Sequence, residues 1–255
     1  MPDIFEYLRY TANLIAGSRF GNQIILKVGS VLLSKLIECG REDLFRFTRD
    51  LDIHCDKKEV WMDFYTNIES VLNINDRGYI YKITKRRSQE KGLDTSDSLT
   101  FLLNDNGKAI QFKMDMNIKS NNIITVDYSP ILNLTTYDTY TMLSDKITAV
   151  SSRKIFRRIK DLYDITVLAA IQSYSYLNIM EHLNTKHPDA ALTNMLTPEN
   201  FSDLEHAYQM YKGITNKPYI GDLIGYSSAF LEPFYIGYNQ GDLIWNAQES
   251  KWVRS

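Results

Sequence analysis

Apolar and polar positions along this chain follow two different periods. In the first third of the chain, stretches at helical spacing are separated by short apolar runs, with Gly17 and Gly40 as breaks. These patterns predict helix, strand, helix, strand and helix over residues 4–16, 24–26, 31–37, 46–55 and 57–72, in that order. The chain is therefore expected to open with helices and strands in alternation.

Residues 79–126 then alternate between apolar and polar side chains, which is the period of a half-buried strand. The alternating segments are YIYKIT, SLTFLL, AIQFKMDMNIK and IITVDY, with Asp105-Asn106-Gly107 as a hairpin turn. From about residue 137 onward the period becomes helical. The chain is thus predicted to be an α+β protein, with a mixed-sheet domain over residues 1–136 followed by a C-terminal helical bundle domain over residues 137–255.

The strand predicted at 46–55 carries two aspartates on one face. In RFTRDLDIHC the polar side chains recur at every second position, so Asp50 and Asp52 share a face with His54. Two residues along a strand span about 6.6 Å, and the paired cations of phosphoryl-transfer sites lie about 4 Å apart. Carboxylates at this spacing are candidate ligands for two Mg²⁺ or Mn²⁺ ions. An isolated Asp-x-Asp strand is more often plain solvated surface, so the prediction of a metal site here depends on the neighbouring motifs.

A third aspartate lies on a later predicted strand. In KMDMNI, Asp115 alternates with Met114 and Met116, so it belongs to the polar face of that strand. Where the two strands are neighbours in one sheet, Asp115 can align with Asp50 and Asp52. We therefore predict Asp115 as a third metal ligand or as the general base.

Gly29 and Ser30 connect the strand predicted at 24–26 to the helix predicted at 31–37. Small side chains, free backbone N–H groups and the positive end of a helix dipole coincide at such a junction, which suits a triphosphate. On its own, Gly-Ser before a helix is usually just a cap. The order Gly-Ser, helix, Asp-x-Asp strand and later strand aspartate is much rarer by chance than its parts, and it predicts a metal-dependent site for a nucleoside triphosphate.

Two basic clusters are candidate phosphate contacts. The first comprises Lys146, Arg153 and Arg157, whose spacing predicts a basic stripe along one helix, with Lys146 as the preferred functional residue. The second comprises Lys82, Lys85, Arg86, Arg87 and Lys91, on or beside a strand. The second cluster fits an RNA backbone and fits equally well the charges that protect an edge strand.

Composition limits the kinds of partner. With 255 residues and a formal net charge of -2, the chain lacks a strongly basic coat, so a nucleic-acid contact must be a local patch. Its cysteines, Cys39 and Cys55, have no metal-ligand spacing and are expected to be core thiols in a reducing compartment. No segment approaches the roughly 18 uninterrupted apolar residues of a membrane span. We expect no membrane contact and a cytoplasmic location.

Five segments resemble the motifs of the AbiE-type abortive-infection nucleotidyltransferase toxins, a branch of the DNA polymerase beta-like superfamily. They are LKVGSVLL, RFTRDLDI, KMDMNI, SDKITAV and KDLYDI, in the family's order over residues 26–168. The resemblance implies that the mixed-sheet domain is a nucleotidyltransferase domain. It also implies that Gly29 and Ser30 open the nucleotide-binding motif, that Asp50 and Asp52 bind metal, and that Asp115 supplies the superfamily's third carboxylate.

The resemblance extends into the helical half of the chain. It implies that Lys146 is the lysine of the family's Glu-Lys-Leu motif and binds the nucleotide, and that Asp161 and Asp164 are the acidic residues of its Arg-Asp-Leu-Tyr-Asp motif. The chain departs from the family pattern at Val28, where a second glycine is common, at Asp145 in place of glutamate, and at Lys160 in place of arginine. Loss of an arginine fork weakens a bidentate contact.

These features predict a metal-dependent nucleotidyltransferase that moves a nucleoside monophosphate from an NTP to an acceptor hydroxyl. The resemblance further implies the toxin of a toxin-antitoxin or phage-defence pair, RNA such as tRNA as the acceptor, and an antitoxin that need not contact the toxin. Two alternatives stay open. One is a nucleotide-binding regulatory or scaffold protein without turnover, and the other is a nucleotidyltransferase that modifies a protein or a small molecule.

Overall fold

The computed structural model of the chain describes residues 3–55, 57–91, 94–118, 125–151, 154–188 and 190–255. The chain divides into two compact units. The first comprises Met1–Lys35, Phe47–Asn122 and Val126–Tyr137, and the second comprises Leu36–Arg46, Ile123–Thr125 and Asp138–Ser255. Among the described residues, the structure has no helix that is long and apolar enough to cross a membrane.

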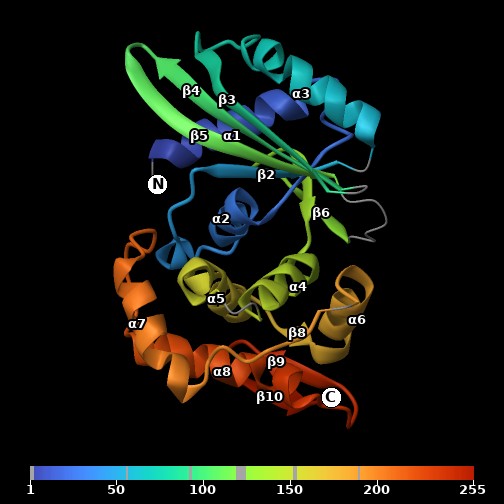
Figure 1. Cartoon of the computed structure of the whole chain (residues 1–255), viewed down its shortest axis with the longest axis vertical. Coiled ribbons are helices and arrows are strands. Elements are labelled where there is room, and N and C mark those ends of the chain that lie inside the picture. The colour runs from blue at the N-terminus through green and yellow to red at the C-terminus, as the bar shows by residue number, and fades with distance from the viewer. Residues whose placement is uncertain (1–2, 56, 92–93, 119–124, 152–153, 189) are drawn as a thin grey trace. The chain divides into compact units, whose positions relative to one another are not determined.

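The first unit is built on a seven-stranded sheet with the strand order β3-β4-β5-β2-β1-β7-β6 (Figure 1). The strands are β1 (Ile25–Leu26), β2 (Asp50–His54), β3 (Ile80–Lys91), β4 (Asp94–Asp105), β5 (Lys108–Ile118), β6 (Val126–Ser129) and β7 (Leu134–Tyr137). Strand β2 pairs with β5 in parallel, and so does β1 with β7. The remaining neighbours pair in antiparallel fashion. The predicted mixed sheet is confirmed.

Three helices accompany this sheet: α1 (Asp3–Ala16), α2 (Val28–Glu38) and α3 (Lys58–Leu72). Helices α1 and α3 lie on one side of the sheet, and α2 lies on the other side, below β2 in the view of Figure 1. The apolar stripe of α3 is buried as its helical spacing predicts, with Trp61, Phe64 and Ile68 fully covered. Beneath these helices, Phe101 of β4 stacks on Phe112 of β5 with 5.2 Å between ring centroids.

The hairpin between β4 and β5 has the turn that its sequence predicts. Asn106 and Gly107 both adopt positive φ angles, 49° and 90°, which is the backbone that Asn-Gly favours in a two-residue hairpin. Because the turn is this short, it fixes which residues of β4 and β5 lie opposite each other. This register determines the composition of both faces of the sheet.

The second unit is mainly helical, as predicted. Its helices are α4 (Thr139–Val150), α5 (Ile155–Ile171), α6 (Tyr176–Lys186), α7 (Phe201–Met210) and α8 (Ile220–Ile236), with short 3-10 turns η1 (Glu42–Leu44) and η2 (Pro198–Asn200). It also contains a small sheet of order β10-β9-β8, built from Tyr174–Ser175 (β8), Leu243–Asn246 (β9) and Lys251–Arg254 (β10). These strands are too short for a periodic signal, so the sequence pattern did not reveal them.

Aromatic side chains join this small sheet to α8. Phe230 of α8 stacks on Trp252 of β10 at 5.4 Å and meets the edge of Trp245 of β9 at 5.0 Å, both measured between ring centroids. The indole N–H of Trp245 donates to the backbone carbonyl of Ala169 in α5 at 2.8 Å. The aromatic residues of α8 therefore pack a core, as their four-residue spacing predicts.

Two predictions from the sequence are wrong. Helix α4 ends at Val150 and α5 begins at Ile155, so Lys146 and Arg157 lie on different helices and share no stripe. Arg153, the third residue of the predicted stripe, lies outside the described residues. Cys55 is buried as expected, but Cys39 is exposed just after the end of α2.

Candidate active site

Strand β2 presents its aspartates on one face. Asp50 and Asp52 are partly exposed, whereas Leu51 and Ile53 between and beyond them are fully buried. The predicted alternation therefore holds from Asp50 to Ile53, whereas His54, expected on the same polar face, is buried. By strand register, Asp50 and Asp52 lie on the face of the sheet opposite to the buried side chains Leu51, Met114 and Leu99.

The pairing of β2 with β5 brings the third aspartate alongside. Asp52 is the direct partner of Asp115, and Asp50 is the partner of Lys113, in a parallel register. Directly paired residues of neighbouring strands point to the same face, about 4.8 Å apart along the hydrogen-bonding direction. Asp115 is partly exposed, while its neighbours Met114 and Met116 are fully buried. The sheet face that carries Asp50, Asp52 and Asp115 is called the carboxylate face below.

Gly29 and Ser30 lie in the first turn of α2, because this helix already begins at Val28 and not at the predicted residue 31. A Cβ atom added to Gly29 would stand 2.9 Å from Thr48 Oγ1 and 3.8 Å from the carbonyl oxygen of Asp50. The start of the helix thus lies directly against the strand that carries the aspartates. Only glycine fits this approach without a shift of Thr48.

Ser30 contributes a buried hydroxyl at the same helix end. Its side chain has no exposed surface, and its Oγ has no hydrogen-bond partner among the described residues. The N–H groups of a first helical turn also have no acceptor within the helix. A buried hydroxyl without a partner costs free energy, and an anionic oxygen at this helix terminus would supply the acceptor.

The residue types on the carboxylate face suit hard divalent cations, which prefer carboxylate oxygens. Among the described residues, however, no three histidine, cysteine, aspartate or glutamate side chains form a ready group that could hold an ion. Like-charged carboxylates repel when no cation lies between them, so side chains that the backbone aligns are expected to turn apart. The strand register therefore fits a metal site, and the side-chain positions would have to close around the ion.

The other predicted residues form a buried ionic network in the second unit. Lys146 Nζ lies 2.5 Å from Asp161 Oδ1 and 2.8 Å from Asp164 Oδ2. Arg46 donates hydrogen bonds from both Nε and Nη2 to the carboxylate of Asp164, the one from Nη2 at 2.7 Å. Arg158 reaches the remaining oxygen of Asp161 at 3.2 Å. Asp164 is fully buried and Asp161 is 3 % exposed, so these charges are matched almost without water.

Opposite charges keep this network ionised in spite of its burial. Burial alone would raise the pKa of Asp164, but Arg46 and Lys146 outweigh it and lower that pKa to about 2. Burial likewise disfavours the charged form of Lys146, yet Asp164 and Asp161 raise the pKa of this amine above its ordinary value. The catalytic roles expected for Lys146, Asp161 and Asp164 stay predictions, because the contacts observed are those of charges that satisfy one another.

Sequence reasoning missed Arg46, which is central to this network. Arg46 stands between Phe45 and Phe47 and is half-buried, and a cation flanked by aromatic residues was the available signal. Two of the three departures from the family pattern, Lys160 and Asp145, have surroundings that the structure shows directly. Lys160 is exposed on α5. Asp145 pairs with Lys186 at 2.8 Å and with His187 at 2.9 Å.

The mixed sheet with its aligned aspartates, and helix α2 with Gly29 in its first turn against that sheet, are features expected of a nucleotidyltransferase. Comparison of the sequence with family descriptions supports this class. The chain belongs to the family described as nucleotidyl transferase AbiEii toxin, type IV toxin-antitoxin system, whose model matches residues 13–214. The predicted resemblance is therefore confirmed, and with this membership come an NTP substrate and an antitoxin partner.

Solved structures share the fold. The structure of JHP933 from Helicobacter pylori superposes with a TM-score of 0.54 at 14% identity, over 91% of this chain and 90% of that chain. A structure from H. pylori described as a candidate nucleotidyltransferase gives a TM-score of 0.56 at 14% identity, over 93% of this chain and 97% of that chain. No curated protein sequence matches the chain.

Proposed function

We propose that the chain transfers a nucleoside monophosphate from an NTP to a hydroxyl group of an RNA acceptor, and that the carboxylate face of the first unit is the catalytic centre. The observation that carries this proposal is the direct pairing of Asp52 with Asp115, two residues from Asp50 on the same face. The adjoining α2 terminus, with Gly29 packed against Thr48 and Asp50, supports it.

Different residues are proposed for binding of the triphosphate and for proton transfer. The first turn of α2 binds the triphosphate through its N–H groups and the Ser30 hydroxyl. The acceptor oxygen attacks the alpha phosphorus, the bond from that phosphorus to the bridging oxygen of pyrophosphate breaks, and pyrophosphate leaves with the electron pair. Asp115 takes the proton of the attacking hydroxyl or holds a metal ligand position.

Asp50 and Asp52 would hold the divalent cations, with Asp115 as the third ligand. When bound, Mg²⁺ or Mn²⁺ supplies charge neutralisation for the triphosphate and lowers the pKa of the attacking hydroxyl. The aligned carboxylates also repel one another, so the apo protein should bind such cations detectably. The catalytic roles expected for Lys146, Asp161 and Asp164 stay predictions, and the observed ion pairs of these residues also join α4 to α5.

The proposal places the protein in the cytoplasm, where NTPs and RNA occur together. It also attributes the toxic effect to nucleotidyl transfer itself. Growth arrest on expression without the antitoxin should therefore depend on intact aspartates of the carboxylate face. An Asp50→Asn variant should express without growth arrest, because the exchange removes a ligand charge and leaves the shape of the side chain.

The test is incubation of the purified protein with Mg²⁺, each alpha-labelled NTP and total cellular RNA plus protein, with label and pyrophosphate followed in parallel. Asp50→Asn is compared with Asp63→Asn, a partly exposed aspartate of α3 whose surface pair with Arg19 is worth little. We expect label in RNA for the wild type and for Asp63→Asn, and none for Asp50→Asn.

Three results would contradict this proposal in different ways. Label in a protein band would redirect the activity to protein modification. Nucleotide binding without pyrophosphate release would identify a regulatory or scaffold protein. Undiminished label with Asp50→Asn would place the catalytic centre elsewhere in the chain.

A further inference from the structure

Rows of polar side chains run across the carboxylate face from the aspartates to the edge of the sheet. Strand register gives one row as Arg87, Ser98, Asp115 and Asp52, on β3, β4, β5 and β2. The next row is Lys85, Thr100, Lys113 and Asp50, on the same four strands. Directly paired residues share a face. Each row therefore begins on edge strand β3 with a cation and ends on β2 with a proposed catalytic carboxylate.

A β-bulge puts the cations of β3 on this face. Lys82 pairs with Leu102 and Ile83 with Phe101, but the register then shifts, and Lys85 pairs with Thr100. Thr84 is the extra residue, and its hydroxyl donates to the carbonyl oxygen of Thr100 at 3.2 Å. Without this insertion, strict alternation would turn Lys85 and Arg87 to the opposite face from Lys82. The bulge thus collects Lys82, Lys85 and Arg87 on the carboxylate face.

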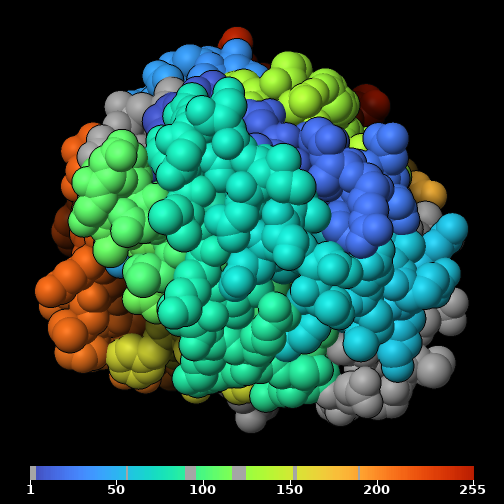
Figure 2. All heavy atoms as spheres, turned by 90° about the horizontal axis from the view of Figure 1, so that it is seen from above, coloured from blue at the N-terminus to red at the C-terminus, as the bar shows by residue number. Residues whose placement is uncertain are grey.

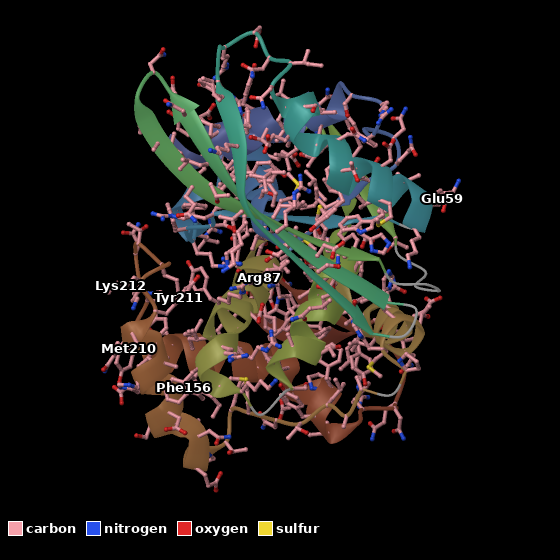
Figure 3. All side chains as sticks on the ribbon, turned by 45° about the horizontal axis from the view of Figure 1, so that its top comes forward. Glu59, Arg87, Phe156, Met210, Tyr211 and Lys212 are labelled. Carbon is pink, nitrogen blue, oxygen red and sulfur yellow. The ribbon has the colours of Figure 1, made fainter. Side chains whose placement is uncertain are left out.

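These cations have open surroundings. Lys82, Lys85, Arg87 and Lys113 are all exposed. Within the described part of the chain, none of the four has an ion pair with an acidic side chain. The side chain of Arg87 extends from β3 in Figure 3. Seen from above, turquoise atoms of β3 and of its connection to α3 lie at the surface of the first unit (Figure 2). Unmatched cations beside a carboxylate site indicate an anionic partner.

Protection of the sheet edge does not account for this arrangement. Charges that block edge-to-edge pairing belong on the edge strand itself, but Lys113 lies on β5, two strands inside the sheet. Arg86 shows the alternative placement on the same strand, because it points to the other face, packs over the ring of Tyr65 at 4.9 Å and donates to its backbone carbonyl at 2.5 Å. Edge protection therefore does not explain Lys113, and by itself it does not explain why Lys85 and Arg87 lie in the same rows as the aspartates.

We propose that Lys82, Lys85, Arg87 and Lys113 form a cationic track that binds the phosphates of a single-stranded RNA and leads its reacting hydroxyl to Asp52 and Asp115. This inference rests on the proposed function for the role of the aspartates, and it adds the surface and the residues that position the acceptor. The track residues are positioning residues, since they contact the acceptor backbone and not the reacting atoms.

The size of the track favours a nucleic-acid strand over a small acceptor. Neighbouring strands lie about 4.8 Å apart, so the three steps from β3 to β2 cover about 14 Å. Successive phosphates of one strand lie about 3.4 Å apart along the axis of a duplex and further apart in an extended single strand, so this distance covers more than one phosphate in either form. A single small group held at the aspartates would not extend to β3.

The experiment measures binding of a fluorescently labelled oligouridylate, without NTP or metal, to the full chain over a series of salt concentrations. The test variant is Lys85→Gln/Arg87→Gln. The matched control is Lys57→Gln/Arg86→Gln, which removes the same charge from the first unit, at the start of α3 and on the opposite face of β3. Melting temperature and binding of a fluorescent NTP analogue are recorded for all proteins, to show that fold and nucleotide site are intact.

We expect the test variant to bind the oligouridylate at least about 10-fold more weakly at low salt, with the slope of log affinity against log salt reduced by about 1.4, since each phosphate contact on a single strand contributes about 0.7. The control should bind like the wild type. NTP-analogue binding should be unchanged in both variants.

The proposed track is contradicted if the test variant binds RNA as tightly as the wild type. It is also contradicted if the test variant and the control lose RNA affinity to the same extent. Weakened RNA binding by the test variant alone, in a protein whose wild type transfers no label to RNA, supports the track and rejects the proposed function. The RNA assignment is also overturned if the Lys85→Gln/Arg87→Gln variant transfers less label to a protein acceptor than the wild type does, but the same amount of label to RNA.

Discussion

Two groups of aspartates in this molecule have opposite surroundings. On the carboxylate face, Asp50, Asp52 and Asp115 are partly exposed and stand beside one another on neighbouring strands. In the second unit, Asp161 and Asp164 are buried and are held by Lys146, Arg158 and Arg46.

The difference separates two uses of the same side chain. A buried carboxylate whose oxygens are all matched by cations holds helices together, and its loss leaves a charge without a partner. Partly exposed carboxylates aligned on neighbouring strands are suited to bind a ligand such as a divalent cation. Activity should therefore depend on the first group at little cost in stability, and stability should depend on the second.

The largest effect is expected for Asp50→Asn. We predict a loss of nucleotidyl transfer of at least about 10³-fold, which corresponds to about 4 kcal/mol of transition-state stabilisation. The melting temperature should change little, because Asp50 is partly exposed and lies outside the buried ionic network. Transfer assays and thermal unfolding of the same preparation check both parts, and a clear loss of stability would assign Asp50 to the structural group.

Asp164→Asn should show the reverse pattern. The exchange leaves the buried guanidinium of Arg46 without its bidentate partner, and breaking such a pair costs about 3–5 kcal/mol. Urea unfolding measures this loss, with the exposed Asp203→Asn of α7 as a control that should change stability by less than about 0.5 kcal/mol. Full stability together with lost transfer would show that Asp164 belongs to the catalytic group.

Gly29→Ala tests the contact between α2 and β2. The added methyl group would stand 2.9 Å from Thr48 Oγ1, so the helix start must move, at a cost of about 1–3 kcal/mol. We expect weaker NTP binding and a lower melting temperature, with partial recovery of both in Gly29→Ala/Thr48→Ala. Wild-type NTP affinity in Gly29→Ala would show that the helix terminus does not bind the triphosphate.

Acid should weaken the ionic network by a smaller amount. The pKa of Asp164 is lowered from 3.8 to about 2 in the folded chain, so the stability that this group contributes is complete above pH 3.8 and is lost as pH falls towards about 2. The contribution is on the order of 2 kcal/mol. Urea unfolding at a series of pH values should show this slope in the wild type, and the slope should flatten in Asp164→Asn.

Local patterns predicted much of the first unit. The spacing of apolar residues gave α1 and α3 almost to the residue, Asp105-Asn106-Gly107 gave the hairpin turn, and alternation gave the faces of β2 and β5. In each case the deciding interactions lie within a few residues of one another. Such interactions are present in the sequence pattern itself.

What the sequence could not give depends on residues far apart in the chain. The pairing of Asp52 with Asp115 is a choice of strand neighbours, and the shift at Thr84 changes which cations reach the carboxylate face without any local signal. Arg46 and Asp164 are 118 residues apart, and their contact decides that Asp164 is matched and buried. Packing between distant segments of this kind follows from shape and charge in three dimensions, not from period.

The most direct test of the catalytic assignment is a double-mutant cycle on Asp52→Asn and Asp115→Asn, with transfer of alpha-labelled NTP to RNA as the readout. If the paired aspartates act on one metal site, each single variant should lose at least about 10²-fold in transfer activity. The double variant should then be little less active than the less active of the two single variants. Asp115→Asn with wild-type transfer, or losses that multiply in the double variant, would contradict the account.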